Sequence, residues 1–110
     1  MLSNREGNWR SLDPETAMRG VRDDMGRSEL IEVAYGARCG VARRIALVRL
    51  NNPEMNAAFA KEDPDPMVRR RLVRTLSNRD DLERISVVDG DASVREAAMQ
   101  RLDELNDSER

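Results

Sequence analysis

The stretch DPDPMVRRRLVRTL, residues 63–76, decides the fold of this chain. Two Asp-Pro pairs run into a valine that is followed by three arginines. The same outline returns in DASVREAAMQRL at 91–102 and, more faintly, in VAYGARCGVARRIALVRL at 33–50. The outline therefore recurs with a period of about 26 residues, which is in the range typical of repeat architectures. Because the arrangement recurs, we interpret it first as a feature of the fold and only second as a sign of function.

Apolar residues recur within each copy at helical spacing. The middle copy carries four of them on one face of a predicted helix: Val68, Leu72, Val73 and Leu76. A shorter apolar segment lies upstream in every copy, where Val33, Phe59 and Ile85 are separated by the same constant interval. Because such spacing places side chains along one side of a helix, each copy is predicted to form two short helices. We place the copies at about 28–51, 52–77 and 78–105, within a repeat region that spans 28–110 and ends in a short C-terminal tail.

Capping residues support this division. Asp65 followed by Pro66 is the preferred order for a helix start. Gly36 and Gly90 close the first helices of two copies, where we expect a residue in the left-handed conformation. The composition agrees, because hydrophobic residues make up 39% of the chain and aromatic residues only 3%. A core of aliphatic side chains suits helices better than sheets, and we predict an all-α fold.

An N-terminal segment, residues 1–27, precedes the repeats and carries one further predicted helix at 14–25. Trp9 lies ahead of that helix in a polar stretch without helical period. Stacked repeats leave an open apolar end that must be covered. We expect Trp9 and the helix to cap the first helix pair. The alternative is that Trp9 is an exposed anchor for a partner.

The order of these features resembles HEAT-like repeats, and most closely the leucine-rich repeat variant. The resemblance is carried by FAKEDPDPMVRRRLVRTL at 59–76 and ISVVDGDASVREAAMQRL at 85–102, and it covers roughly 28–105. It implies a short right-handed α-solenoid, a superhelix of stacked helix pairs in which the shorter helix sometimes tightens to a 3₁₀ turn. It also implies the binding of other macromolecules. One protein with variant repeats carries an iron–sulfur cluster on several cysteines, but Cys39 stands alone here, so no cofactor is predicted.

Three arginines recur early in the second helix of each copy: Arg43, Arg69 and Arg95. An arginine is unfavourable there, because the positive end of the helix dipole is close. Acidic partners are available four residues earlier and in the next turn of the repeat: Asp63, Asp65, Asp89 and Asp91. We interpret these residues as a structural ladder in which arginine and aspartate alternate along the stack. A direct ligand contact is the alternative.

A second set of arginines lies off the apolar stripe and is not required by the repeat: Arg44, Arg49, Arg70, Arg71 and Arg74. Residues 38–79 hold ten basic and four acidic side chains, whereas 80–110 hold four basic and ten acidic. The basic set has three interpretations. It is a solvated face in an arginine-rich chain, a docking surface for an acidic protein, or a grip on a nucleic-acid backbone. The sequence pI near 5.3 and the lack of aromatic residues among these arginines favour the protein partner.

The sequence contains few of the residue patterns on which catalysis commonly depends. The chain has no histidine, which removes the commonest general base and the usual zinc sites. The stretch DGDAS at 89–93 fails as a calcium loop, because Val94 and Gln100 stand where glycine and glutamate are required. We therefore predict no metal site, no cofactor and no enzymatic activity. Cys39, with no base nearby in sequence, is interpreted as a small apolar residue.

The remaining expectations concern location and assembly. No apolar run approaches the roughly 20 residues that span a bilayer, and the N-terminus lacks the apolar core of a signal peptide. A single cysteine suits a reducing compartment, so a cytoplasmic protein is predicted. The acidic end of the chain, at 103–109, could meet the basic middle of a second copy. That pattern predicts weak head-to-tail self-association.

Overall fold

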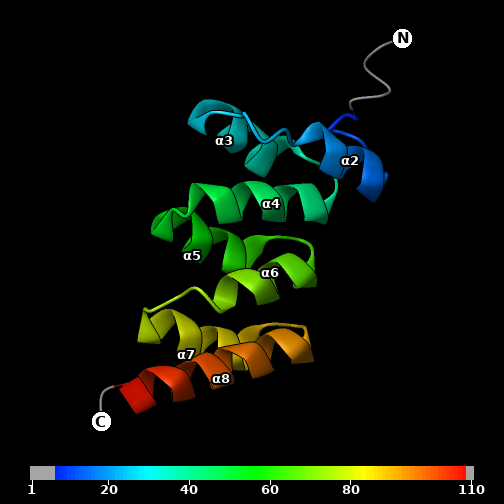
Figure 1. Cartoon of the computed structure of the whole chain (residues 1–110). Coiled ribbons are helices and arrows are strands. Elements are labelled where there is room, and N and C mark those ends of the chain that lie inside the picture. The colour runs from blue at the N-terminus through cyan, green and yellow to red at the C-terminus, as the bar shows by residue number, and fades with distance from the viewer. Residues whose placement is uncertain (1–6, 109–110) are drawn as a thin grey trace. The chain divides into compact units, whose positions relative to one another are not determined.

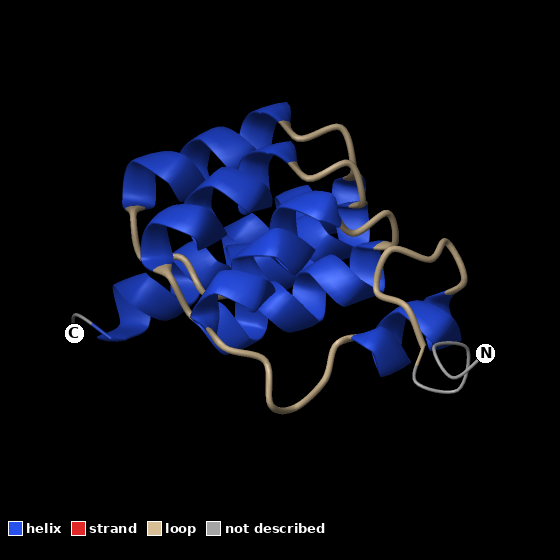
Figure 2. Cartoon of the chain, turned by 90° about the horizontal axis from the view of Figure 1, so that it is seen from above, coloured by secondary structure: helices blue, strands red, loops and turns tan. Residues whose placement is uncertain are grey.

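The computed structural model describes residues 7–108. Residues 1–6 of the predicted N-terminal segment and 109–110 of the predicted tail lie outside the described residues. The described part contains seven helices and no strand. Figures 1 and 2 show how these helices follow one another along the chain. The predicted all-α fold is therefore confirmed. The chain divides into two compact units, 1–52 and 53–110, and each is described by itself below.

The first unit contains α2 (Pro14–Gly20), α3 (Arg27–Gly36) and α4 (Gly40–Leu50). The helices α3 and α4 pack as a pair, and α2 packs against α4. The ring of Trp9 lies over α3, because a Cβ placed on Gly36 would come within 3.3 Å of its Cζ3 atom. Trp9 is half-buried and Arg10 stacks on it, with the guanidinium carbon 3.9 Å from the ring centre.

The helix expected at 14–25 is shorter than predicted, since α2 ends at Gly20. The segment that carries Trp9 passes directly over this glycine. A Cβ on Gly20 would lie 2.6 Å from the backbone carbon of Asn8, and closer still to the Trp9 nitrogen. Only a glycine fits beneath that backbone. The helix ends at this contact, and Val21 and Met25 enter the core from the following loop.

The second unit contains α5 (Pro53–Glu62), α6 (Pro66–Val73), α7 (Arg79–Val88) and α8 (Ala92–Ser108). The pairs α5 with α6 and α7 with α8 each form a helical hairpin, and α6 packs against α8 to join the two hairpins. In Figure 1 these four helices carry the colours from green to red. The equivalent valines of the repeat, Val68 and Val94, are both fully buried in this unit.

One expectation about the helix ends is wrong. Gly36 and Gly90 do not have positive φ, and α3 and α7 end in extended residues, Ala37 and Asp89. The only left-handed residue that ends a helix in the described chain is Asn51, with φ of 46° after α4. The first helix of each described pair is α rather than 3₁₀. It is the shorter member in α3 with α4 and in α7 with α8, but α5 has 10 residues and its partner α6 has 8.

The core is aliphatic, and its members recur with the period of the sequence. Leu30 and Leu82 are buried at equivalent places in α3 and α7. The equivalent residue of α5 is Asn56, which is 6% exposed. Its Oδ1 atom is buried and accepts no hydrogen bond within residues 7–108. A buried carbonyl without a donor costs stability, so Asn56 is a weak point in an otherwise apolar register.

Replacing Asn56 with leucine should raise the free energy of unfolding by about 1 kcal/mol, because it removes the unpaired oxygen and restores the side chain found at the equivalent places. Urea unfolding followed by circular dichroism measures the change. The control is Gln100→Leu, which replaces an exposed helical amide and should not raise stability in this way. A lower unfolding midpoint for Asn56→Leu would show that the site has no room for the larger side chain.

Candidate interaction surface

Each arginine of the ladder is anchored to a backbone carbonyl six residues earlier. Arg69 donates from Nη1 to the oxygen of Asp63 over 2.8 Å, and Arg95 does the same to Asp89 over 2.7 Å. Arg43 donates to Ala37 over 3.0 Å. The recurring bond ties the start of the second helix to the end of the first. It also explains how Arg43 is held without an aspartate at the position four residues earlier.

The aspartates order the loops between the helices. Asp63 and Asp89 each accept a hydrogen bond from the backbone N–H two residues later, both over 2.9 Å. Asp65 caps α6 and Asp91 caps α8. Each carboxylate accepts a hydrogen bond over 2.8 Å from the backbone N–H two residues later, that of Met67 or Ser93. The predicted pairing of these caps with the arginine four residues on is not formed. The N–H groups at the helix start occupy the carboxylate instead.

One ion pair joins the two hairpins of the second unit. Arg69 on α6 donates from Nε and Nη2 to both carboxylate oxygens of Asp89, over 2.9 and 3.0 Å. The side chains are 15% and 5% exposed. Burial by itself raises the pKa of Asp89, but hydrogen bonds from Arg69 and from the Asp91 amide outweigh it and hold the pKa below its usual value. The same pair raises the pKa of the Arg69 guanidinium.

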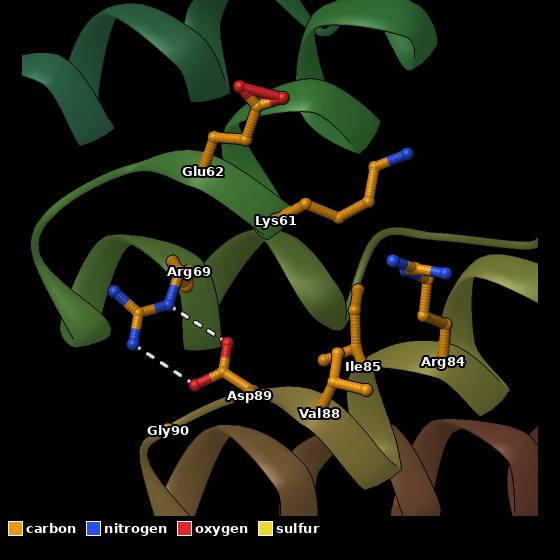
Figure 3. Close-up of a pocket in the computed structure, with 8 residues that line it drawn as sticks. All are labelled: Lys61, Glu62, Arg69, Arg84, Ile85, Val88, Asp89 and Gly90. Atoms are coloured by element: carbon orange, nitrogen blue, oxygen red, sulfur yellow. Dashed lines mark hydrogen bonds and ion pairs between the residues drawn. The ribbon is translucent and has the colours of Figure 1, made fainter.

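This ion pair forms one end of a groove of about 420 Å³ in the second unit. Figure 3 shows Arg69 and Asp89 facing each other at that end, with Arg84 of α7 at the other. Val88 lies between them, and it is 63% exposed. Sequence reasoning missed this groove. The only signal was the pair of valines at 87–88, which interrupts the polar side of the predicted helix.

The predicted basic face is only partly assembled. Arg70, Arg71 and Arg74 all belong to α6 or its C-cap, and none of them makes a hydrogen bond or ion pair with any residue that the structure describes. Arg70 and Arg74 line one side of a smaller groove, of about 180 Å³, beside α8. The opposite wall contains Glu96 and Gln100.

The other two predicted members lie in the first unit. Arg49 is engaged with the loop after α2, where it donates to the Arg22 carbonyl over 2.7 Å and to Asp23 over 3.1 Å. It therefore serves to hold that loop. Arg44 is half-buried on α4 and has no partner among residues 7–108. The structure thus brings together three of the five predicted arginines, those on α6.

Within residues 7–108 no three side chains of the kinds that ligate metals come close enough to hold an ion. Over the same range no helix has both the length and the apolar character to cross a membrane. Cys39 is half-buried at the start of α4 and makes no disulfide.

Comparison of the chain with protein-family models, with curated proteins and with solved structures found no match.

Breaking the buried ion pair should be costly. Asp89→Asn leaves the Arg69 guanidinium with an uncharged partner, and we expect a loss of about 3 kcal/mol in the free energy of unfolding. Chemical denaturation measures it. The control is Asp81→Asn, which breaks the more exposed 3.3 Å contact with Lys61. The control should cost under about 1 kcal/mol. Equal effects of the two substitutions would contradict a special role for Asp89.

The low pKa of Asp89 also predicts a pH dependence. The carboxylate is favoured in the folded state, so its contribution is complete above the ordinary aspartate pKa of about 3.9. It disappears as pH falls through the lower value in the fold. The wild type should therefore lose stability below about pH 4 more steeply than Asp89→Asn. Thermal unfolding at a series of pH values tests this. Parallel plots of Tm against pH for the wild type and Asp89→Asn would exclude Asp89 as a source of the pH dependence.

Proposed function

We propose that the chain is a non-enzymatic interaction module, built from three HEAT-like repeats, that binds an acidic protein segment through Arg70, Arg71 and Arg74. The observation that carries the proposal is the difference between two sets of arginines. Arg69 and Arg95 are bonded within the fold, whereas the three on the outer side of α6 have no partner among the described residues. Unpaired charge of one sign on one helix attracts a partner of opposite charge.

The repeat interpretation is supported by contacts that return with the period of the sequence. Three of them recur in the second unit: the carbonyl bond of the arginine, the turn closed by the first aspartate and the cap made by the second. The packing of α6 against α8 is how successive helix pairs stack in such folds. A right-handed superhelix over the three copies is part of this proposal.

The small groove beside α6 favours a carboxylate-bearing ligand. Arg70 and Arg74 are four residues apart on one side of the helix, so their guanidinium groups reach the same stretch of a bound chain. Arginine forks match carboxylates in a bidentate manner. Gln100 and Ser93, which also line the groove, offer further polar groups for the backbone of an extended or helical peptide.

Reversing two of these charges tests the proposal directly. Arg70→Glu with Arg74→Glu should abolish recovery of an immobilised polyglutamate peptide in a pull-down. The substitutions replace the attraction between the arginines and the peptide carboxylates with repulsion, and they remove the contacts that position the peptide on α6. Arg70 is half-buried, Arg74 is exposed and neither has a partner among residues 7–108, so the circular dichroism spectrum should be unchanged. The matched control is Arg84→Glu on α7, an exposed arginine that likewise has no partner among those residues.

The same variants distinguish a nucleic acid from a protein partner. A DNA duplex bound through these arginines would show a mobility shift at low salt that weakens steeply as salt rises. We expect no such shift for the wild type at any salt concentration. Retained peptide binding by the double variant would remove these arginines from the proposed surface, and a salt-dependent DNA shift lost in that variant would replace the protein partner.

A further inference from the structure

The guanidinium group of Arg95 is only partly used. Its Nη1 donates to the Asp89 carbonyl over 2.7 Å, and the residue makes no ion pair with any residue among 7–108. Arg69 has the same carbonyl anchor and uses Nε and Nη2 to hold the carboxylate of Asp89. Arg95 therefore presents the two N–H groups with which its counterpart grips an aspartate.

The apolar side chains that follow the two arginines along their helices also differ, because those after Arg69 are buried and those after Arg95 are more exposed. Val73 and Leu76 follow Arg69 at four and seven residues, and they are 0% and 5% exposed. Met99 and Leu102 follow Arg95 at the same spacing. Met99 is 50% exposed and Leu102 is half-buried. The apolar side chains that follow Arg69 on α6 are thus buried, whereas their counterparts on α8 are accessible to solvent.

The helices that pack against α6 indicate what fits the open set. The aspartate held by Arg69 comes from the end of α7, and α8 itself supplies the packing against α6. A small carboxylic acid would satisfy only the arginine, because it would leave Met99 and Leu102 in water. A helical polypeptide with an aspartate satisfies both, since burial of the apolar residues accompanies the bidentate contact.

We propose that Arg95, Met99 and Leu102 form a docking surface, here called the α8 surface, for a helical segment of a partner polypeptide that presents an aspartate as α7 presents Asp89 to Arg69. The α8 surface is separate from the arginines of α6, so it is a second binding site rather than a refinement of the first. The chemistry it selects is a carboxylate set beside apolar side chains.

A peptide taken from the chain itself is the first probe. Residues 78–108, which contain α7, Asp89 and α8, are titrated against the full chain by calorimetry. We expect binding that weakens about tenfold with Asp89→Asn in the peptide, and by a similar factor with Arg95→Gln or Met99→Glu in the full chain. Arg84→Gln and the Arg70→Glu, Arg74→Glu pair should leave the affinity unchanged, which separates this surface from the proposed α6 site.

A covalent version removes the requirement that a short peptide fold alone. In the extended chain, residues 104–110 are replaced by a second copy of 78–108. The copied aspartate then follows Arg95 by the same interval at which Asp89 follows Arg69. We expect Tm to rise by about 4 °C or more. The rise should disappear when the copied aspartate becomes asparagine, and in a double-mutant cycle it should be absent on an Arg95→Gln background.

Two results would overturn the proposal. One is an extended chain whose Tm does not rise, or rises equally with the copied aspartate and with asparagine. The other is self-association of the unmodified full chain, measured by sedimentation, that is lost in Arg95→Gln. That result would assign the α8 surface to contact between copies of this chain instead of to a separate partner.

Discussion

The structure depends on one contact, the bond from an arginine at the start of a second helix to the carbonyl six residues earlier. It closes the loop between the helices of a pair and fixes the direction in which the second helix leaves. It also places a guanidinium group at the junction, where its remaining N–H groups need acceptors because burial removes water. In the second unit Asp89 meets that need for Arg69, so the contact within one hairpin prepares the contact between two.

Most of the fold could be predicted because its signals are local and periodic. Val68 and Val94 are buried, as their places in the apolar stripe of each helix predicted. Asp65 caps α6 by accepting a hydrogen bond from the backbone N–H of Met67. The carbonyl anchor could not be predicted, because backbone oxygens leave no trace in a sequence. The role of Asp65 was ambiguous for a related reason. Its position suits both a cap and an ion pair, and only the geometry of the helix start decides between them.

The candidate site was less predictable than the fold. The sequence marks arginines that the repeat does not need, but not which of them the fold engages elsewhere. Arg49 shows the difficulty, since its partners, the Arg22 carbonyl and Asp23, lie far away in the chain and belong to a loop. That loop begins where α2 stops at Gly20, beneath the backbone of a segment that precedes the helix. Such contacts between separate segments appear only in three dimensions.

The turn between the helices has a consequence for how such a chain grows. In one hairpin the residue between the two aspartates is Pro64, and in the other it is Gly90, yet the hydrogen bonds are the same. The centre of the turn therefore accepts either residue, while each of the two hairpins carries an aspartate in its turn and an arginine at the start of its second helix. A further hairpin with the same two residues would bring with it both groups of the Arg69–Asp89 contact, so it could pack on the second unit without a substitution elsewhere.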